Sequence, residues 1–275
     1  MTTSRPASKK TRDLAPRLRG APDPLVGSVS ARFFSATSEE IRPVPDRVAE
    51  ALGANLVFER LAGHGRGGTA MAEPAAHDWM LDVAEGLAAA RAVGERVVVI
   101  STSTGGHFGN RGRSGSGAVA RRGGDGVHLS QFRDQRSGGL CPDPAGGALV
   151  AAEGGGGNLF LCAAQRGPWS IWTTSYPTVA LLPMAALVER VVDLDVSGVT
   201  IPALFRLSDA DKVVRPDITR AVAARWGGPV AIQAVEMGPQ DDPNAHVIAG
   251  DIQSPGQTDA TVRDILDWLE RVGVK

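Results

Sequence analysis

The sequence has few cysteines, no excess charge of either sign and no long apolar run near its amino terminus. Its two cysteines, Cys141 and Cys162, are too few for a disulfide framework and lack the C-x-x-C spacing of a zinc site. A formal net charge of −1 provides no global attraction to nucleic acid or to an anionic membrane. Residues 1–19 lack the apolar run that a signal peptide or membrane anchor requires. We therefore expect a cytoplasmic protein that binds a small molecule, with no nucleic-acid partner and no membrane span.

The sequence that is present alternates between strand and helix patterns. Apolar periodicity predicts helices at 39–52, 74–92, 179–192, 216–226 and 258–272, and strands at 55–58, 96–101, 201–207 and 229–235. The β-branched run from Val97 to Ile100 is typical of a strand covered on both faces. At 275 residues the chain has room for one α/β domain or for two small ones, and one is the simpler interpretation. We predict an α/β fold with a mostly parallel central sheet and helices on both faces.

Two stretches do not fit this pattern. Residues 1–33 are rich in Arg, Pro, Ser and Ala and show no strand or helix period, which predicts a disordered tail. Residues 107–168 contain no Ile, Met, Lys or Tyr and include four consecutive glycines at 154–157. A loop of that length is uncommon in a compact domain. We therefore expect a domain at 34–275 with an anomalous Gly/Arg-rich segment at 107–171, and a sheet that is incomplete at the N-terminus and in the middle.

The strand at 96–101 runs directly into Ser101-Thr102-Ser103-Thr104-Gly105. This small-x-Ser-x-Gly pattern is typical of a nucleophile elbow, a tight turn from strand to helix that exposes a serine hydroxyl at the end of the sheet. Ser101 stands where the first glycine usually lies, and serine is also small. The pattern makes Ser103 the candidate nucleophile, and the alternative is an ordinary Ser/Thr-Gly turn.

A serine nucleophile needs a base and a group that orients the base. His246 lies after the last predicted strand and before the last helix, and Asp211 lies in the turn after the strand at 201–207. Gly63-His64-Gly65 follows the first predicted strand. Along the chain the order is therefore this turn, then Ser103, Asp211 and His246, and it resembles the order in the α/β-hydrolase superfamily, specifically in its lipase and carboxylesterase branch with the monoacylglycerol lipases. The resemblance covers residues 35–106 and 176 to the carboxyl end.

The resemblance implies hydrolysis of a small-molecule or lipid carboxylic ester through an acyl-serine intermediate, with no cofactor and no metal. Ser103 would attack, His246 would transfer the proton, and Asp211 would hold the imidazole. The oxyanion would be bound by the backbone N–H of Thr104 and by a second N–H from the loop after an early strand, for which Phe34 is the candidate.

The sequence leaves several alternatives open. Asp209 is the second candidate for the acid, and a metal site at Asp241, Asp242 and His246 is a less favoured interpretation. The resemblance implies that His64, in a turn similar to one of monoacylglycerol lipases and carboxylesterases, has a structural role and is not the general base. The same scaffold could also serve an acyltransferase or a thioesterase, or could be a catalytically inactive remnant.

The loop that supplies the second oxyanion donor is usually marked His-Gly, and this motif is absent before Phe34. Codons for residues 29–33, shifted by one base, can encode Tyr-Leu-His-Gly-Phe. The same shift at 125–134 can yield Met-Val-Phe-Ile-Ser-Pro-Asn-Phe-Ala-Ile, a strand and its turn, although each shifted codon leaves one base free. We interpret 1–33 and 107–171 as compensated frameshifts. The alternative is a natural Gly-rich insert with a disordered tail.

The glycines that follow the nucleophile have an energetic consequence. Glycine in a helix interior costs about 1 kcal/mol relative to alanine, and Gly109, Gly112, Gly115 and Gly117 lie where a helix should support the elbow. Their sum is a large part of the roughly 5 to 15 kcal/mol that stabilises a typical domain. We therefore expect poor folding between 107 and 170 and little or no activity in the chain as it stands.

Overall fold

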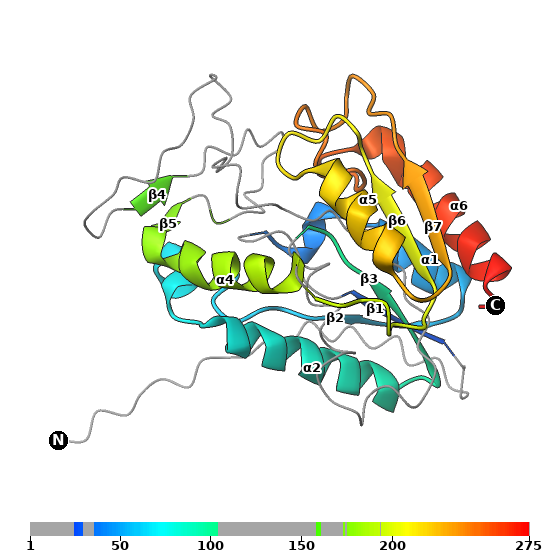
Figure 1. Cartoon of the computed structure of the whole chain (residues 1–275), viewed down its shortest axis with the longest axis horizontal. Coiled ribbons are helices and arrows are strands. Elements are labelled where there is room, and N and C mark those ends of the chain that lie inside the picture. Colours follow the sequence, from blue (N-terminus) through cyan, green and yellow to red (C-terminus); the bar gives the residue numbers. More distant parts are fainter. Residues whose placement is uncertain are drawn as a thin grey trace.

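A computed structural model describes residues 25–29, 36–103, 158–160, 173, 175–192 and 194–274 (Figure 1). The strands are β1 (Leu25–Val29), β2 (Asn55–Phe58), β3 (Arg96–Ile100), β4 (Asn158–Phe160), β5 (Ser175–Pro177), β6 (Ala203–Leu207) and β7 (Val230–Ala234). The α-helices are α1 (Val44–Ala51), α2 (Ala76–Ala92), α4 (Leu181–Val192), α5 (Pro216–Arg225) and α6 (Pro255–Arg271). Short 3-10 helices are η1 (Ser38–Glu40), η2 (Gly68–Ala72) and η4 (Thr178–Ala180).

The main strand pairings are parallel. β1 lies between β2 and β3, and its last residue, Val29, is in register with Phe58 on one side and with Ile100 on the other. β6 and β7 form a second parallel pair, whereas β4 and β5 are antiparallel. The predicted α/β fold with a mostly parallel sheet is therefore confirmed.

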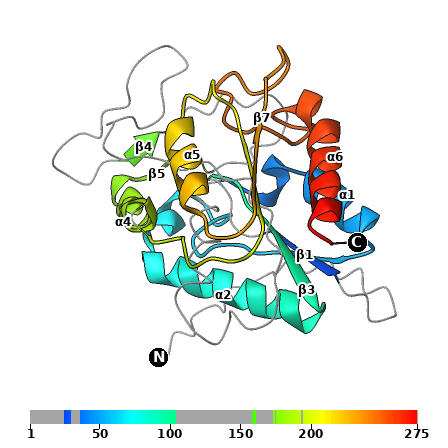
Figure 2. The same cartoon turned by 45° about the vertical axis from the view of Figure 1, so that its right-hand side comes forward.

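Helices cover both faces of the strands (Figure 2). On β3, Val97 and Val99 belong to a buried cluster with side chains of α2, α4 and α5. The alternate residues Val98 and Ile100 belong to another cluster, which contains side chains of α1 and α6. Because successive side chains of a strand point to opposite faces, one β-branched run supplies both cores.

The prediction that residues 1–33 contain no strand is wrong for β1. Its sequence, Leu-Val-Gly-Ser-Val, has a glycine at its centre, Gly27, and glycine weakens a strand because it has no side chain to pack. The backbone of β1 is nevertheless paired on both sides, and this tertiary context outweighs local propensity. One strand of the amino-terminal part of the sheet is therefore present within 1–33. Within the anomalous segment at 107–171, the structure describes only β4.

The predicted helix at 39–52 is divided into η1 and α1. Pro45 lies in the first turn of α1, where its missing N–H costs no helical hydrogen bond, and Pro43 is the N-cap. A proline therefore marks the start of the helix rather than lying in its interior. None of the described helices is long and apolar enough to cross a membrane.

Arg206 of β6 is a buried cation that connects three elements. Its guanidinium donates to Gln233 of β7 over 2.7 Å, to Thr261 of α6 over 3.2 Å, and to Asp264 of α6. Burial lowers the pKa of Arg206, and the bond to Asp264 opposes that shift. We expect Arg206→Ala to lower the free energy of unfolding by about 2 to 3 kcal/mol, because it removes a buried network and its packing. Urea denaturation measures this loss.

The matched control for this prediction is Arg215→Ala. Arg215 pairs with Asp217, but both side chains are largely exposed, so the pair contributes less than about 1 kcal/mol. Equal losses in the two variants would contradict a stabilising role for the buried network.

Candidate active site

Ser103 lies three residues after the end of β3, in a backbone conformation that is unusual for serine. Its φ is 53°, in the left-handed region that costs an L-residue about 1 to 2 kcal/mol. Such a strained turn at the end of a buried strand is what a nucleophile elbow requires. Ser103 is buried, and its Oγ lies 3.1 Å from Nε2 of His246. The turn thus presents the hydroxyl to the imidazole.

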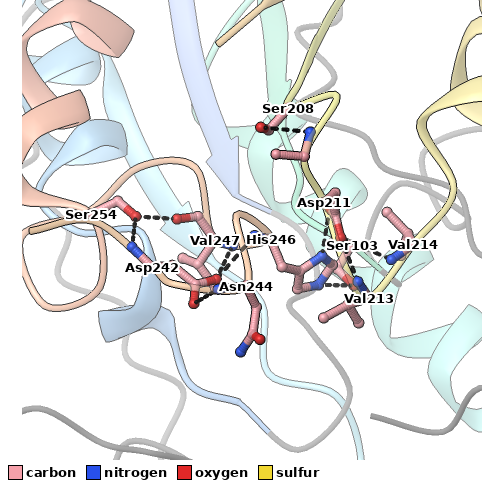
Figure 3. Close-up of polar contacts among 11 residues, drawn as sticks. Ser103, Ser208, Asp211, Val213, Val214, Asp242, Asn244, His246, Val247 and Ser254 are labelled. Atoms are coloured by element: carbon pink, nitrogen blue, oxygen red, sulfur yellow. Dashed lines mark hydrogen bonds and ion pairs between the residues drawn. The ribbon is translucent and has the colours of Figure 1, made fainter. Parts of the chain in front are cut away.

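Asp211 lies in the loop after β6, a strand whose five residues are all buried. One carboxylate oxygen, Oδ1, accepts the backbone N–H groups of Val213 at 2.7 Å and Val214 at 2.9 Å. The other oxygen, Oδ2, lies 3.0 Å from Nδ1 of His246. The two backbone bonds fix the carboxylate, so that its free oxygen points to the histidine (Figure 3).

His246 connects the other two side chains. Its two ring nitrogens contact Asp211 and Ser103, and its side chain is buried. A carboxylate at Nδ1 favours the tautomer that carries its proton on Nδ1, which leaves the Nε2 lone pair free to accept the serine proton. Serine, histidine and aspartate therefore form one continuous row of hydrogen bonds.

Asp209 lies apart from this row. Its side chain is 64% exposed, and both of its oxygens accept bonds from Arg220, at 2.8 and 2.9 Å. The geometry therefore favours Asp211 over Asp209 as the partner of His246.

His64 has contacts of a different kind. Its Nδ1 lies 3.2 Å from the carbonyl oxygen of Ala62, which also accepts the Nε1–H of Trp79 at 3.0 Å. The rings of His64 and Trp79 meet edge to face, with centroids 6.0 Å apart. These contacts are those of a histidine that orders a turn. His77 is mostly exposed, and His107 and His128 lie outside the described residues.

The metal-site interpretation of Asp241, Asp242 and His246 finds no support in the geometry. Asp241 accepts the backbone N–H groups of Gly238 and Gly256, at 2.8 and 2.9 Å. Asp242 likewise accepts backbone N–H groups of its own loop. In the part of the chain that the structure describes, no group of His, Cys, Asp and Glu side chains is arranged to hold a metal ion.

The two predicted oxyanion donors, Thr104 and Phe34, lie outside the described residues. The end of β1 is nevertheless informative. Val29 is paired with Ile100, the last residue of β3 before the Ser101–Ser103 turn. Because β1 and β3 are parallel, the chain leaves both strands at the same edge of the sheet. The end of β1 thus lies beside the end of β3, three residues before Ser103.

The sequence matches no family model and no curated protein. Solved structures do match. One is from work on LipS and LipT, two metagenome-derived lipolytic enzymes, with 18% identity, coverage of 91% of this chain and 95% of that chain, and a TM-score of 0.71. A monoacylglycerol lipase from Paleococcus ferrophilus has 14% identity, coverage of 91% and 95%, and a TM-score of 0.58. Est1E from Butyrivibrio proteoclasticus, with ferulic acid bound, has 14% identity, coverage of 92% and 92%, and a TM-score of 0.56. The chain has the α/β-hydrolase fold.

Proposed function

We propose that this chain carries the catalytic centre of a serine hydrolase that cleaves carboxylic esters. The observation that carries the proposal is the row of hydrogen bonds from Ser103 through His246 to Asp211. Similar structures from lipolytic enzymes and an esterase support the choice of ester substrates.

The geometry supports a two-step mechanism. His246 Nε2 removes the proton of Ser103 Oγ as this oxygen attacks the ester carbonyl carbon, and Asp211 stabilises the imidazolium that forms. The imidazolium then gives its proton to the leaving alcohol, so that an acyl-serine remains. In the second step His246 removes a proton from water, the resulting hydroxide attacks the acyl carbon, and Ser103 recovers its proton as the acid leaves.

Turnover of p-nitrophenyl esters of increasing chain length tests this proposal directly. An acyltransferase or thioesterase on the same scaffold would instead act on acyl-CoA, with an alcohol or water as acceptor. Covalent labelling by a fluorophosphonate reports the activated serine in either case. Folded protein that is not labelled at Ser103 would identify the chain as an inactive remnant.

The proposed activity also requires oxyanion donors, and the shifted frame would supply the loop that carries one of them. The last residue of β1, Val29, pairs with the last residue of β3, Ile100, and the resemblance requires the His-Gly motif in the segment that follows such a strand. The shifted frame supplies His-Gly within four residues of the end of β1. Resequencing the coding DNA across 1–33 and 107–171 tests the interpretation, and an undisturbed frame on both strands would refute it.

Two chains are compared, one with only 107–171 restored to the shifted frame and one with both 1–33 and 107–171 restored. The second is expected to have a kcat/KM for a p-nitrophenyl ester about 10²- to 10³-fold higher than the first. One oxyanion donor contributes a factor of this size to catalysis. The two chains differ throughout 1–33, which contains β1 as well as the loop after it, so steady-state rates are compared only if both chains show the same thermal unfolding. Equal rates in the two chains would contradict the assignment of that loop to the oxyanion.

A further inference from the structure

The carboxylate of Asp242 is buried and bonded entirely to its own loop. Its Oδ2 accepts the backbone N–H groups of His246 at 3.0 Å and Val247 at 2.9 Å, and its Oδ1 accepts that of Asn244 at 3.0 Å (Figure 3). Asp242 is only 8% exposed. One side chain thus holds the backbone N–H groups of three residues in the loop that contains His246.

Ser254 joins the two ends of the same loop. Its Oγ accepts the backbone N–H of Asp242 at 3.1 Å and donates to the carbonyl oxygen of Val247. Ser254 is fully buried and is the N-cap residue of α6, so this contact ties the loop to a helix. Between these ends, Ala245 has a φ of 52°, a left-handed conformation that local bonds must maintain. The N–H of Ala245 donates to the carbonyl of Asp242 over 2.8 Å.

Lys212 connects the loop to the turn that contains Asp211. The backbone N–H of Lys212 donates to the carbonyl of Asn244 over 2.9 Å, and its Nζ donates to the carbonyl of Pro243 over 2.8 Å. The histidine loop is therefore anchored to α6 on one side and to the acid turn on the other. The position of this loop therefore determines the distances from the ring nitrogens of His246 to Ser103 and to Asp211.

We propose that Asp242 is a positioning residue for His246. It fixes the backbone of the histidine so that Nδ1 meets Asp211 and Nε2 meets Ser103. Asp242 contacts the backbone N–H of His246 and not its ring, so its role differs from that of Asp211. The consequence for catalysis rests on the proposed function, because it acts through His246. A displacement of about 1 Å in a reacting group can lower a rate by about 100-fold.

Asp242→Ala is expected to lower the rate of fluorophosphonate labelling at Ser103 by about 100-fold, and Asp242→Asn by about 10-fold. Alanine leaves three N–H groups without an acceptor, whereas asparagine retains one carbonyl oxygen for His246 and Val247. KM for a p-nitrophenyl ester should stay within about twofold. Asp242 bonds to the backbone of the histidine loop, so its loss is expected to slow the chemical step rather than to weaken substrate binding.

Asp241→Ala is the matched control. Asp241 is the adjacent aspartate, also buried, and also accepts two backbone N–H groups, but these belong to Gly238 and to Gly256 at the start of α6. The control should lose thermal stability comparably to Asp242→Ala. At a temperature where all variants are folded, its labelling rate should stay within about twofold of the parent.

A second readout does not depend on activity. The Nδ1 proton of His246, hydrogen-bonded to Asp211, should give a downfield proton NMR signal that disappears in an Asp211→Asn variant. This signal should be lost in Asp242→Ala and retained in Asp241→Ala. A signal that persists in Asp242→Ala, or that is lost equally in both variants, would overturn the positioning role. If the parent is never labelled but the signals follow the expected pattern, the positioning role stands and the proposed function fails.

Discussion

In the chain with 1–33 and 107–171 restored to the shifted frame, Ser103→Ala is expected to remove covalent labelling by a fluorophosphonate completely and to lower kcat for a p-nitrophenyl ester by about 10⁵- to 10⁶-fold. The alanine lacks the oxygen that attacks the ester, and losses of this size are typical when the nucleophile of a serine triad is removed. Mass spectrometry of the labelled protein identifies the modified residue, and assays at high protein concentration measure the remaining rate.

Ser208→Ala is the control for this experiment. Ser208 is also a buried serine directly after a strand, but its Oγ accepts the backbone N–H of Ala210 and belongs to the acid turn. Labelling should persist in this variant. Labelling that survives Ser103→Ala would show that another residue is the nucleophile and would overturn the proposed function.

The proposed row of side chains could be predicted because Ser103 and Asp211 have local sequence signals and His246 lies between the last predicted strand and the last predicted helix. Ser103 follows a β-branched run in a small-x-Ser-x-Gly turn, and the structure gives this turn a positive φ. Asp211 is followed by Val213 and Val214, and the backbone N–H groups of these two residues hold its carboxylate. The hydrogen bonds through His246 then show that the turns after β3 and β6 lie close together, although these two strands belong to separately paired groups.

Other features depend on contacts that no local pattern reveals. β1 has a central glycine and a weak strand signal, and its place in the sheet comes from pairing with β2 and β3. Asp242 looks like an ordinary turn aspartate in the sequence. An Asp side chain often bonds to backbone N–H groups just after it, which is a usable signal for the bond to Asn244. The bonds to Val247 and the contact with Ser254 depend on how the loop returns to α6.

The adjacent aspartates Asp241 and Asp242 are both buried, and backbone hydrogen bonds explain why this is possible. A buried carboxylate is costly unless hydrogen bonds replace its hydration. Asp241 and Asp242 each receive backbone N–H bonds, so neither needs a metal ion or a cationic side chain. Adjacent acidic residues that resemble a ligand pair in the sequence thus organise two different segments, the start of α6 and the histidine loop.

In the same restored chain, Asp211→Asn is expected to lower kcat and the fluorophosphonate labelling rate by about 10⁴-fold while the fold is retained. The amide nitrogen would donate toward Nδ1 of His246 and so favour the tautomer with its proton on Nε2, which cannot accept the serine proton. Thermal denaturation and circular dichroism establish that the variant is folded, and single-turnover labelling measures the rate.

Asp209→Asn is the matched control for Asp211→Asn, because it changes an aspartate two residues away in the same turn. Asp209 is mostly exposed and pairs with Arg220, so its replacement should change the labelling rate by less than about threefold. A large loss in Asp209→Asn together with a small loss in Asp211→Asn would reverse the assignment of the acid. That outcome would require the histidine loop to move toward Asp209 in the working protein, and the bonds from Lys212 to the carbonyls of Pro243 and Asn244 oppose such a movement.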